Sequence, residues 1–421
     1  MKKKLLAVAV AGAFGLPGVA LAQSSVTISG FFKGGLDNHK ISNAAATRTG
    51  NKSETRVTDH SSRIIFNVVE NIGGGLEAVG QFDLRFSTDA TVRTQSTAGS
   101  GAVSTSPDIN PVSSGNNHVG LRSKTWGSIR FGRQDTHYGN SGDIGPVSKL
   151  ALWAFNASTF DGVMRPGGTV AAIANWSRTP NLIWYDSPRW GIFNFTIGYS
   201  TNPLRVSGTN EAENDLGRTG RKGRGWTLNP RLEGQNWHLS WSFWDAKADW
   251  TGCPAGSGDA ASVAAFTEAC ANGNDDQRAN TIRGHYIWGG LRVGLAWNHS
   301  KTYTPVTRVL TGDRKAWSLP VVYTMGRHNF YGTYTHVGDS KDTAGGSGAN
   351  TGARQIMLGY AYDLSNRTSV SLTYVKLNND SAARYGLFYV SENVMGGTVA
   401  QTLAPGGEDH RMMGVTLRHS F

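Results

Sequence analysis

The sequence predicts an all-β protein, a transmembrane antiparallel β-barrel of 16 strands, from three observations. First, short segments with apolar side chains at alternate positions recur along the whole chain, and period two is the signature of a strand with two unlike faces. Second, hydrophobic residues make up only 38% of the chain, whereas glycine is abundant at 54 residues. Third, beyond the N-terminal region no stretch approaches the roughly 18 consecutive apolar residues of a membrane helix. Together these features favour a barrel whose apolar residues face lipid.

Residues 1–22 are expected to be a secretory signal peptide, and the mature barrel to occupy residues 23–421. Lys2, Lys3 and Lys4 precede an apolar run over residues 5–19, and the small residues at 20–22 suit a cleavage site. A buried helix is the alternative. The full chain has a net charge of +11, but export argues against nucleic acid as a partner. Residues 24–25, between the cleavage site and the first strand, are too few for the plug domain of an energised transporter.

The first strand is expected to begin at Val26, with Val26, Ile28, Gly30 and Phe32 facing lipid. A polar segment is expected from there to about His60. The second strand follows, and a tight turn at residues 71–75 leads into the third strand over residues 76–86, where alternation is clearest.

The later strands are expected in pairs joined by short turns. Their ranges are 117–123 and 128–134, 181–187 and 192–199, 225–233 and 237–246, 281–288 and 291–299, 315–324 and 329–337, and 354–363 and 368–375, with a closing strand at 410–421. Residues 182–185 do not alternate, which makes that strand the least regular. An even strand number brings the first and last strands together antiparallel, and a sheet in lipid must close to pair every backbone group.

The longest stretch without alternation, residues 135–178, forms the third long loop. It carries Asp143 and Asp161 together with apolar residues such as Ile144, Leu150 and Trp153. A surface flap and a loop folded into the lumen are both open. The apolar content favours the lumen, because these side chains suit packing against a wall.

Alternation also predicts which charged side chains face the lumen. These are Lys33, Arg63, Arg85, Arg122, Arg130, Arg231, Arg283, Arg292 and Arg418, against Glu77, Asp83 and Glu233. Such an excess of cations predicts a positive interior potential, which a narrow channel focuses. The alternative for each arginine is a solvated barrel face or a salt bridge to a loop.

Cys253 and Cys270 lie in one long predicted loop and are expected to form a disulfide in an oxidising periplasm. Two free thiols are the alternative. The chain contains neither a His-Glu-x-x-His nor a Gly-x-Ser-x-Gly motif, so neither an enzyme nor a metal site nor a cofactor is predicted. His118, His238 and His285 fall on the inward face, where histidines are expected to be solvated.

The chain resembles the trimeric Gram-negative porins of the neisserial and β-proteobacterial type. The resemblance rests on motifs in order along the chain: SVT at 25–27, SRI at 62–64, ENIGGGL at 70–76, WGSIRFGRQ at 126–134, NLIWYDSP at 181–188, LGY at 358–360, LSNRT at 364–368 and GVTLRHSF at 414–421. It implies a water-filled channel for passive diffusion of small hydrophilic solutes and ions, with a preference for anions. A substrate-selective porin, an outer-membrane barrel enzyme and an adhesin are the alternatives.

The resemblance also implies a long third loop folded into the lumen, with acids facing arginines. By position, Arg63, Arg130 and Arg178 resemble the wall arginines of the family, with Asp143 and Asp161 opposite. The chain departs from the family at residues 115–117, Gly-Asn-Asn, where relatives often carry a basic residue. The implied partners are two further copies in a homotrimer, outer-membrane lipids and lipopolysaccharide, and the barrel-assembly machinery, for which Phe421 is the expected signal.

Overall fold

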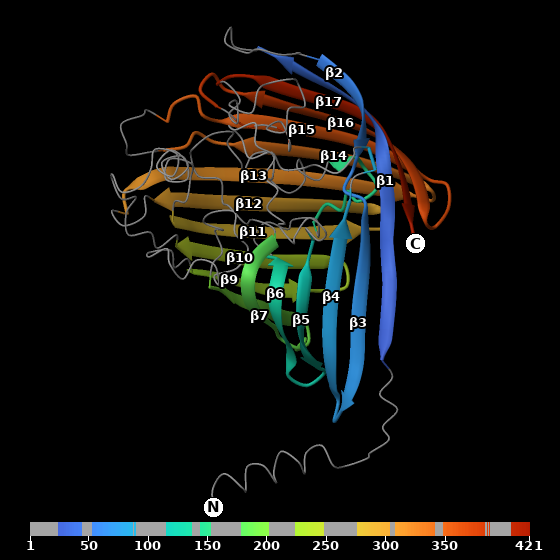
Figure 1. The fold of residues 1–421 in the computed structure, drawn as a ribbon. Coiled ribbons are helices and arrows are strands. Elements are labelled where there is room, and N and C mark those ends of the chain that lie inside the picture. The colour runs from blue at the N-terminus through green and yellow to red at the C-terminus, as the bar shows by residue number, and fades with distance from the viewer. Residues whose placement is uncertain are drawn as a thin grey trace, which may run out of the picture.

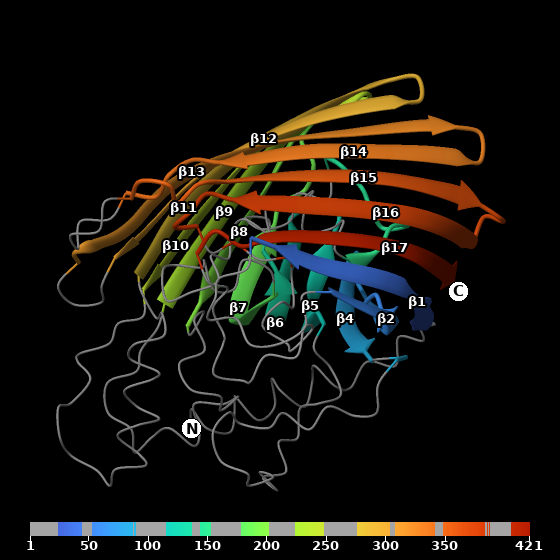
Figure 2. The same ribbon diagram turned by 90° about the horizontal axis from the view of Figure 1, so that it is seen from above.

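The strands follow one another around a single closed antiparallel sheet, in which β1 lies beside β17 (Figures 1 and 2). The computed structural model describes residues 24–43, 53–86, 88–89, 115–136, 144–152, 178–201, 224–247, 276–303, 308–341, 348–383, 385, 387 and 406–421. Within these residues no helix is long and apolar enough to cross a membrane.

From the third predicted strand onward, the strand ends at the short turns agree with the predicted ranges to within one residue, whereas several ends at the long loops extend up to five residues further. The strands are β1 (Ser25–Ser42), β2 (Ser53–Asp59), β3 (Arg63–Gly73), β4 (Leu76–Arg85), β5 (Asn117–Ser123), β6 (Gly127–Asp135), β7 (Arg178–Asp186), β8 (Phe193–Ser200), β9 (Arg224–Glu233), β10 (Trp237–Lys247), β11 (Asp276–Trp288), β12 (Leu291–Tyr303), β13 (Leu310–Met325), β14 (His328–Val337), β15 (Ala353–Asp363), β16 (Thr368–Asn379) and β17 (Asp409–Ser420).

The expected polar segment up to His60 was wrong, because it contains strand. β1 continues to Ser42, and β2 pairs with it from Ser53 to Asp59. β3 pairs with the earlier part of β1, so β2 and β3 are two pieces of one barrel strand and the barrel has 16 strands. An 18-residue strand is longer than the roughly 10 residues that cross a bilayer. Outside lipid its outward face can be polar, and the alternation that reveals a strand fades.

Phe421 lies at the end of the seam where β1 pairs with β17. Its backbone N–H donates to Gly30 O, and its carbonyl accepts from Gly30 N, both at 3.2 Å. Its ring centroid lies 5.6 Å from that of Phe32. A Cβ on Gly30 would lie 2.3 Å from the carbonyl oxygen of Arg63, so this seam requires glycine. The role of Phe421 as an assembly signal remains a prediction.

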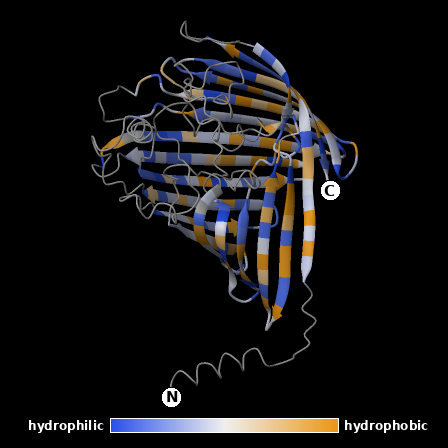
Figure 3. Ribbon diagram, in the orientation of Figure 1, coloured by the Kyte–Doolittle hydropathy of each residue, from blue (hydrophilic) through white to orange (hydrophobic). Residues whose placement is uncertain are grey.

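The outward face is apolar and exposed, as alternation predicted. Val26, Ile28, Leu372 and Val415 are between 47% and 64% exposed, and apolar and polar residues alternate along the strands (Figure 3). A large exposed apolar area is stable only against lipid or another protein.

The irregular strand, β7, has a simple explanation. Leu182 and Trp184 are each 3% exposed, whereas Ile183 between them is 39% exposed. This strand therefore carries apolar side chains on its inner face as well as its outer one. Its side chains alternate between the inner and outer faces, but because both faces are apolar the alternation is not visible in the hydropathy of the sequence.

Candidate functional site

A cluster of cations surrounds an inward-facing aromatic ring at the barrel seam. The charged groups of Arg418, Arg63 and Lys33 lie 4.8, 4.9 and 5.7 Å from the ring centroid of Phe31. Strand pairing causes this, because Phe31 on β1 is opposite Arg63 on β3, and Lys33 is opposite Arg418 on β17. Cations are attracted to the face of an aromatic ring, so the ring helps to hold three like charges together. We call Phe31, Lys33, Arg63 and Arg418 the Phe31 cluster.

Sequence reasoning placed these three cations inward but overlooked Phe31. Alternation could have indicated the inward position of Phe31, since Phe31 lies between two outward positions, the exposed Phe32 and Gly30 at the seam. An aromatic residue at an inward position of a water-filled barrel stands out once the register is fixed.

Asp83 on β4 is the acid beside the Phe31 cluster. It is 2% exposed, and its Oδ2 lies 3.0 Å from Arg85 Nη2 and 3.7 Å from Arg63 Nη1. One carboxylate therefore faces two guanidinium groups, and with Lys33 and Arg418 nearby cations outnumber acids. The local potential at this part of the wall is positive.

Arg130 belongs to a separate group. Its guanidinium lies 5.7 Å from the ring of Trp184 and 3.9 Å from Asp186 Oδ2. Trp184 Nε1 donates to the same oxygen at 3.2 Å. Arg178 lies at the start of β7, but its side chain is outside the described part of the structure, as are Asp143 and Asp161. The predicted opposition of arginines and loop acids stays a prediction.

The remaining predicted inward charges are spread around the wall. Arg122 donates to Glu77 at 2.7 Å, and Arg231 donates to Asn194 Oδ1 at 2.6 Å. Glu233 accepts from Asn194 Nδ2 at 2.9 Å. Arg283 is 1% exposed and is next in sequence to the outward Ile282 on β11. Arg292 is likewise next to the outward Val293 on β12. These charges are distributed around the barrel and do not join the Phe31 cluster.

Residues 144–152, a piece of the long third loop, lie on the inner face of the wall. Lys33 Nζ donates to Leu150 O at 3.1 Å, and Ala151 N donates to Thr373 Oγ1 at 3.2 Å. Leu152 N donates to His60 Nδ1 at 3.2 Å. This piece, called the inner segment below, is thereby tied to β16 on one side and to the β1–β2 region on the other.

The wall under the inner segment is small and apolar. A Cβ on Gly359 would lie 2.3 Å from Leu150 Cδ1, and one on Gly294 would lie 2.8 Å from Ile144 O. Ile144 and Leu150 are fully buried. Lys149 Nζ adds an ion pair with Asp363 at 2.6 Å. The rest of residues 135–178 is outside the described ranges apart from the strand ends, so the inward fold of the whole loop remains a prediction.

The segment that follows β16 also contributes side chains inside the barrel. Tyr385 is 2% exposed and Leu387 is 4% exposed. Arg314, inward on β13, places its guanidinium 5.6 Å from the Tyr385 ring, and Asn379 Nδ2 donates to Tyr385 O at 2.8 Å. Sequence reasoning gave these residues no role. Their apolar side chains shortly after a strand end were the available signal.

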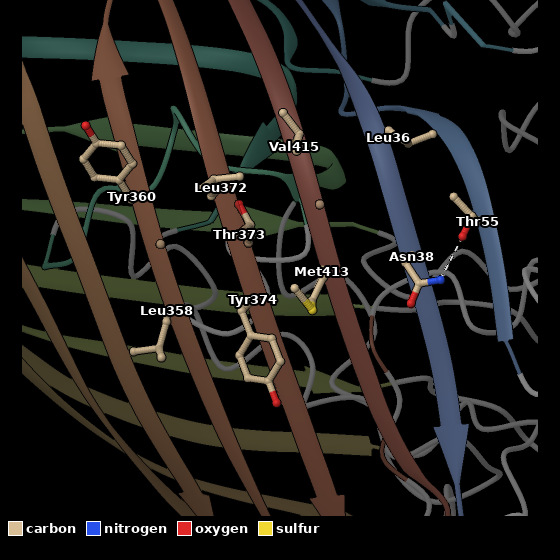
Figure 4. A pocket seen from close by; sticks show the side chains of 12 residues that line it. Leu36, Asn38, Thr55, Leu358, Tyr360, Leu372, Thr373, Tyr374, Met413 and Val415 are labelled. Atoms are coloured by element: carbon tan, nitrogen blue, oxygen red, sulfur yellow. Dashed lines mark hydrogen bonds between the residues drawn. The ribbon is translucent and has the colours of Figure 1, made fainter.

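The outer face has a groove of about 430 Å³ across β15, β16, β17, β1 and β2 (Figure 4). Leu358, Leu372, Met413 and Val415 line it, and Asn38 Nδ2 donates to Thr55 Oγ1 at its edge at 2.8 Å. Because Leu358, Leu372, Met413 and Val415 face outward and are exposed, this groove lies on the lipid side.

The inward histidines have neighbours in the wall. His238 and His285 stack with ring centroids 5.6 Å apart, and His118 packs edge-on against Trp184. Within the residues that the structure describes, no group of three His, Cys, Asp or Glu is arranged to hold a metal ion. Cys253 and Cys270 lie outside the described residues, so their pairing stays a prediction.

Residues 6–382 match the model of the Gram-negative porin family. The chain belongs to this family. It is also 26% identical to an outer membrane porin protein of Bordetella pertussis over 413 residues, covering 88% of this chain and 92% of the relative. Like other Gram-negative porins, it is an outer-membrane channel for passive diffusion.

Solved porin structures share the fold. An anion-selective porin from Comamonas acidovorans superposes with a TM-score of 0.67 at 19% identity, covering 95% of this chain and 100% of that one. The trimer form of OmpT from Vibrio cholerae gives a TM-score of 0.56 at 12% identity, with 94% and 99% covered. At these identities the likeness concerns the barrel architecture.

Proposed function

We propose that this outer-membrane channel prefers small anions, and that the Phe31 cluster is the part of the wall that selects them. The observation that carries the proposal is the gathering of Lys33, Arg63 and Arg418 within 5.7 Å of one ring centroid. Arg85 adds a fourth cation, with Asp83 as the adjacent acid. In a water-filled passage the electrostatic energy of an anion is lower beside such a wall, whereas a cation is repelled.

Further properties belong to the same proposal. Arg130 and Arg178 extend the positive wall, with Asp143 and Asp161 facing it across the passage. The barrel from Comamonas acidovorans is an anion-selective porin, which supports the same preference here. We also propose a homotrimer, supported by the trimer form of the Vibrio cholerae barrel. Lipopolysaccharide would surround this trimer, and the barrel-assembly machinery would recognise Phe421.

A channel selective for one anionic solute is the second candidate. The tight grouping of the cations favours it, because closely spaced cations suit a solute with more than one negative charge better than a monovalent ion. Competition between such a solute and chloride for the current separates the two candidates.

The test is the reversal potential in a salt gradient, measured on single channels in planar bilayers. Replacing Arg63 and Arg418 together by Gln should lower the anion-to-cation permeability ratio about twofold or more, since wall potentials reach several kT. The matched control replaces Lys124 and Arg367, which are exposed in short turns, by Gln. Screening acts over about 8 Å at physiological ionic strength, so the control pair should do much less. Equal shifts in both pairs, or none in either, would contradict the proposal.

A further inference from the structure

His60 lies at the break between β2 and β3 and is completely buried. Hydrogen bonds hold the break in place. Asp59 Oδ2 accepts from the backbone N–H of Ser61 at 2.8 Å and of Ser62 at 3.1 Å, and Ser61 has a φ of 71°. His60 N donates to Lys33 O at 2.8 Å. The break is therefore a defined feature that fixes the position of one imidazole.

The two ring nitrogens of His60 face different groups. Nδ1 accepts from the backbone N–H of Leu152 at 3.2 Å, while Nε2 lies 3.5 Å from Oδ1 of Asp37. A backbone N–H only donates, so Nδ1 must offer a lone pair. In the neutral ring the single proton is then on Nε2, the nitrogen that lies 3.5 Å from the carboxylate. Only this tautomer lets Nδ1 accept from Leu152.

We propose that His60 is a positioning residue that holds the inner segment against the wall only while its imidazole is neutral. A second proton would occupy Nδ1, remove the acceptor and set an N–H against the N–H of Leu152. Acid would thus loosen the inner segment at Leu152. The inference rests on the proposed function in one respect, that the inner segment borders the solute path.

The charged groups around His60 come from three strands, and they include Arg418 of β17, opposite Lys33, and Asp59 of β2, next to His60 in the chain. On β1 these are Asp37, His39 and Lys33, and on β2 Arg56 stands opposite Asp37 while Glu54 stands opposite His39. β17 contributes Gly414 opposite Asp37 and Met412 opposite His39, and the inner segment contributes the Leu152 backbone. Asp37 is the carboxylate in contact with the imidazole. Its place needs Gly414, where a Cβ would lie 2.1 Å from Asp37 Oδ1.

Neighbouring contacts allow the role of His60 to be isolated. Lys33 Nζ holds Leu150 O and Thr373 Oγ1 holds Ala151 N, at 3.1 and 3.2 Å. Neither contact depends on the imidazole. Loss of the His60 contact should therefore release one end of the inner segment while the others stay.

The experiment measures single-channel current fluctuations of the full chain from about pH 8 to about pH 5, where histidine is the side chain that ordinarily titrates. His60→Gln retains a carbonyl acceptor but cannot take the proton. His60→Phe retains a ring but has no acceptor. His238→Gln removes another inward histidine, and Thr373→Val removes a neighbouring tie to the inner segment.

In the unmodified protein, acid should raise the fraction of time in altered conductance levels about fivefold, equivalent to about 1 kcal/mol, the net value of one hydrogen bond. In His60→Gln this fraction should not change with pH, and in His60→Phe it should equal that of the acidified unmodified protein at every pH. His238→Gln should respond to acid as the unmodified protein does. Thr373→Val should raise this fraction at neutral pH and keep the increase in acid. The inference is therefore testable even if a His60 variant fails to fold.

An unmodified channel that ignores pH, or a His60→Gln channel that keeps the full acid response, would overturn the inference. So would a Thr373→Val channel without an acid response. The reversal potential at neutral pH is independent of these outcomes. A channel without anion preference but with a His60-dependent acid response would overturn the proposed function alone.

Discussion

The two sides of the lumen are built from different residues. Around the seam, β1, β3 and β17 place Lys33, Arg63 and Arg418 around Phe31. β4 adds Arg85, paired with Asp83. Along β12 to β16 the inner face instead combines glycine and apolar side chains with buried hydroxyl groups, and the inner segment contacts both kinds. The first side bears charge that can act on solutes, whereas the second is a small hydrophobic core inside a membrane barrel.

The difference shows that the inner face of a barrel can carry apolar side chains where another part of the chain covers it. Met357 and Ala361 on β15 and Val375 on β16 are fully buried although they face inward. Burying apolar area under a covering chain is favourable inside a barrel as in any protein core. The covered side should therefore respond to changes in shape, and the charged side to changes in charge.

The largest effect on conductance is expected from filling the space on the barrel wall that Leu150 occupies. Gly359→Leu places side-chain atoms where Leu150 packs, since even a Cβ would lie 2.3 Å from Leu150 Cδ1. Overpacking of this kind costs about 1–3 kcal/mol, enough to displace the inner segment. Single-channel conductance should change about twofold, since a displaced segment alters the width of a water-filled passage.

Gly332→Leu is the matched control for Gly359→Leu. Gly332 lies on neighbouring β14, and a Cβ there meets nothing within 4 Å. Its conductance should equal that of the unmodified channel. Unchanged conductance in Gly359→Leu would mean that the covered wall does not shape the passage.

A moderate effect is expected from Asp83→Asn on the charged side. Asp83 is 2% exposed and lies near both Arg63 and Arg85, so the amide removes a negative charge that both guanidinium groups face. Anion preference should rise, most clearly at low salt where screening is weakest. Reversal potentials check this, with Glu77→Gln as the control. Glu77 pairs with Arg122 away from the Phe31 cluster, and an equal rise there would contradict a localised selecting wall.

The smallest effect is expected from Lys149→Met. The ion pair with Asp363 is part-exposed on both sides, 29% and 25%, and such pairs contribute about 0–1 kcal/mol. Methionine keeps most of the apolar stem, so the inner segment should stay in place. Conductance should remain near that of the unmodified channel, and thermal unfolding of the purified protein should shift little. A change as large as that of Gly359→Leu would show that charge, and not packing, holds the covered side.

The sequence by itself determined the outer surface and the strand order. Lipid contacts each residue individually, so the requirement for apolar side chains at alternate positions is local and visible in Val26, Ile28 and Leu372. Parity then assigned Lys33, Arg63, Arg85 and Arg418 to the inner face without any tertiary information. Regular turns, such as that at Gly73–Gly75 with three positive φ angles, were equally local.

Tertiary structure alone decided what the inward side chains meet. Phe31 joins Arg63 and Arg418 only because β1 pairs with β3 on one side and with β17, from the far end of the chain, on the other. Alternation failed over β2, where a strand extends beyond lipid, and in β7, where both faces are apolar. The contact of His60 with Leu152 spans 92 residues. Register, barrel closure and the covering of one wall are long-range properties, and no local pattern of hydropathy encodes them.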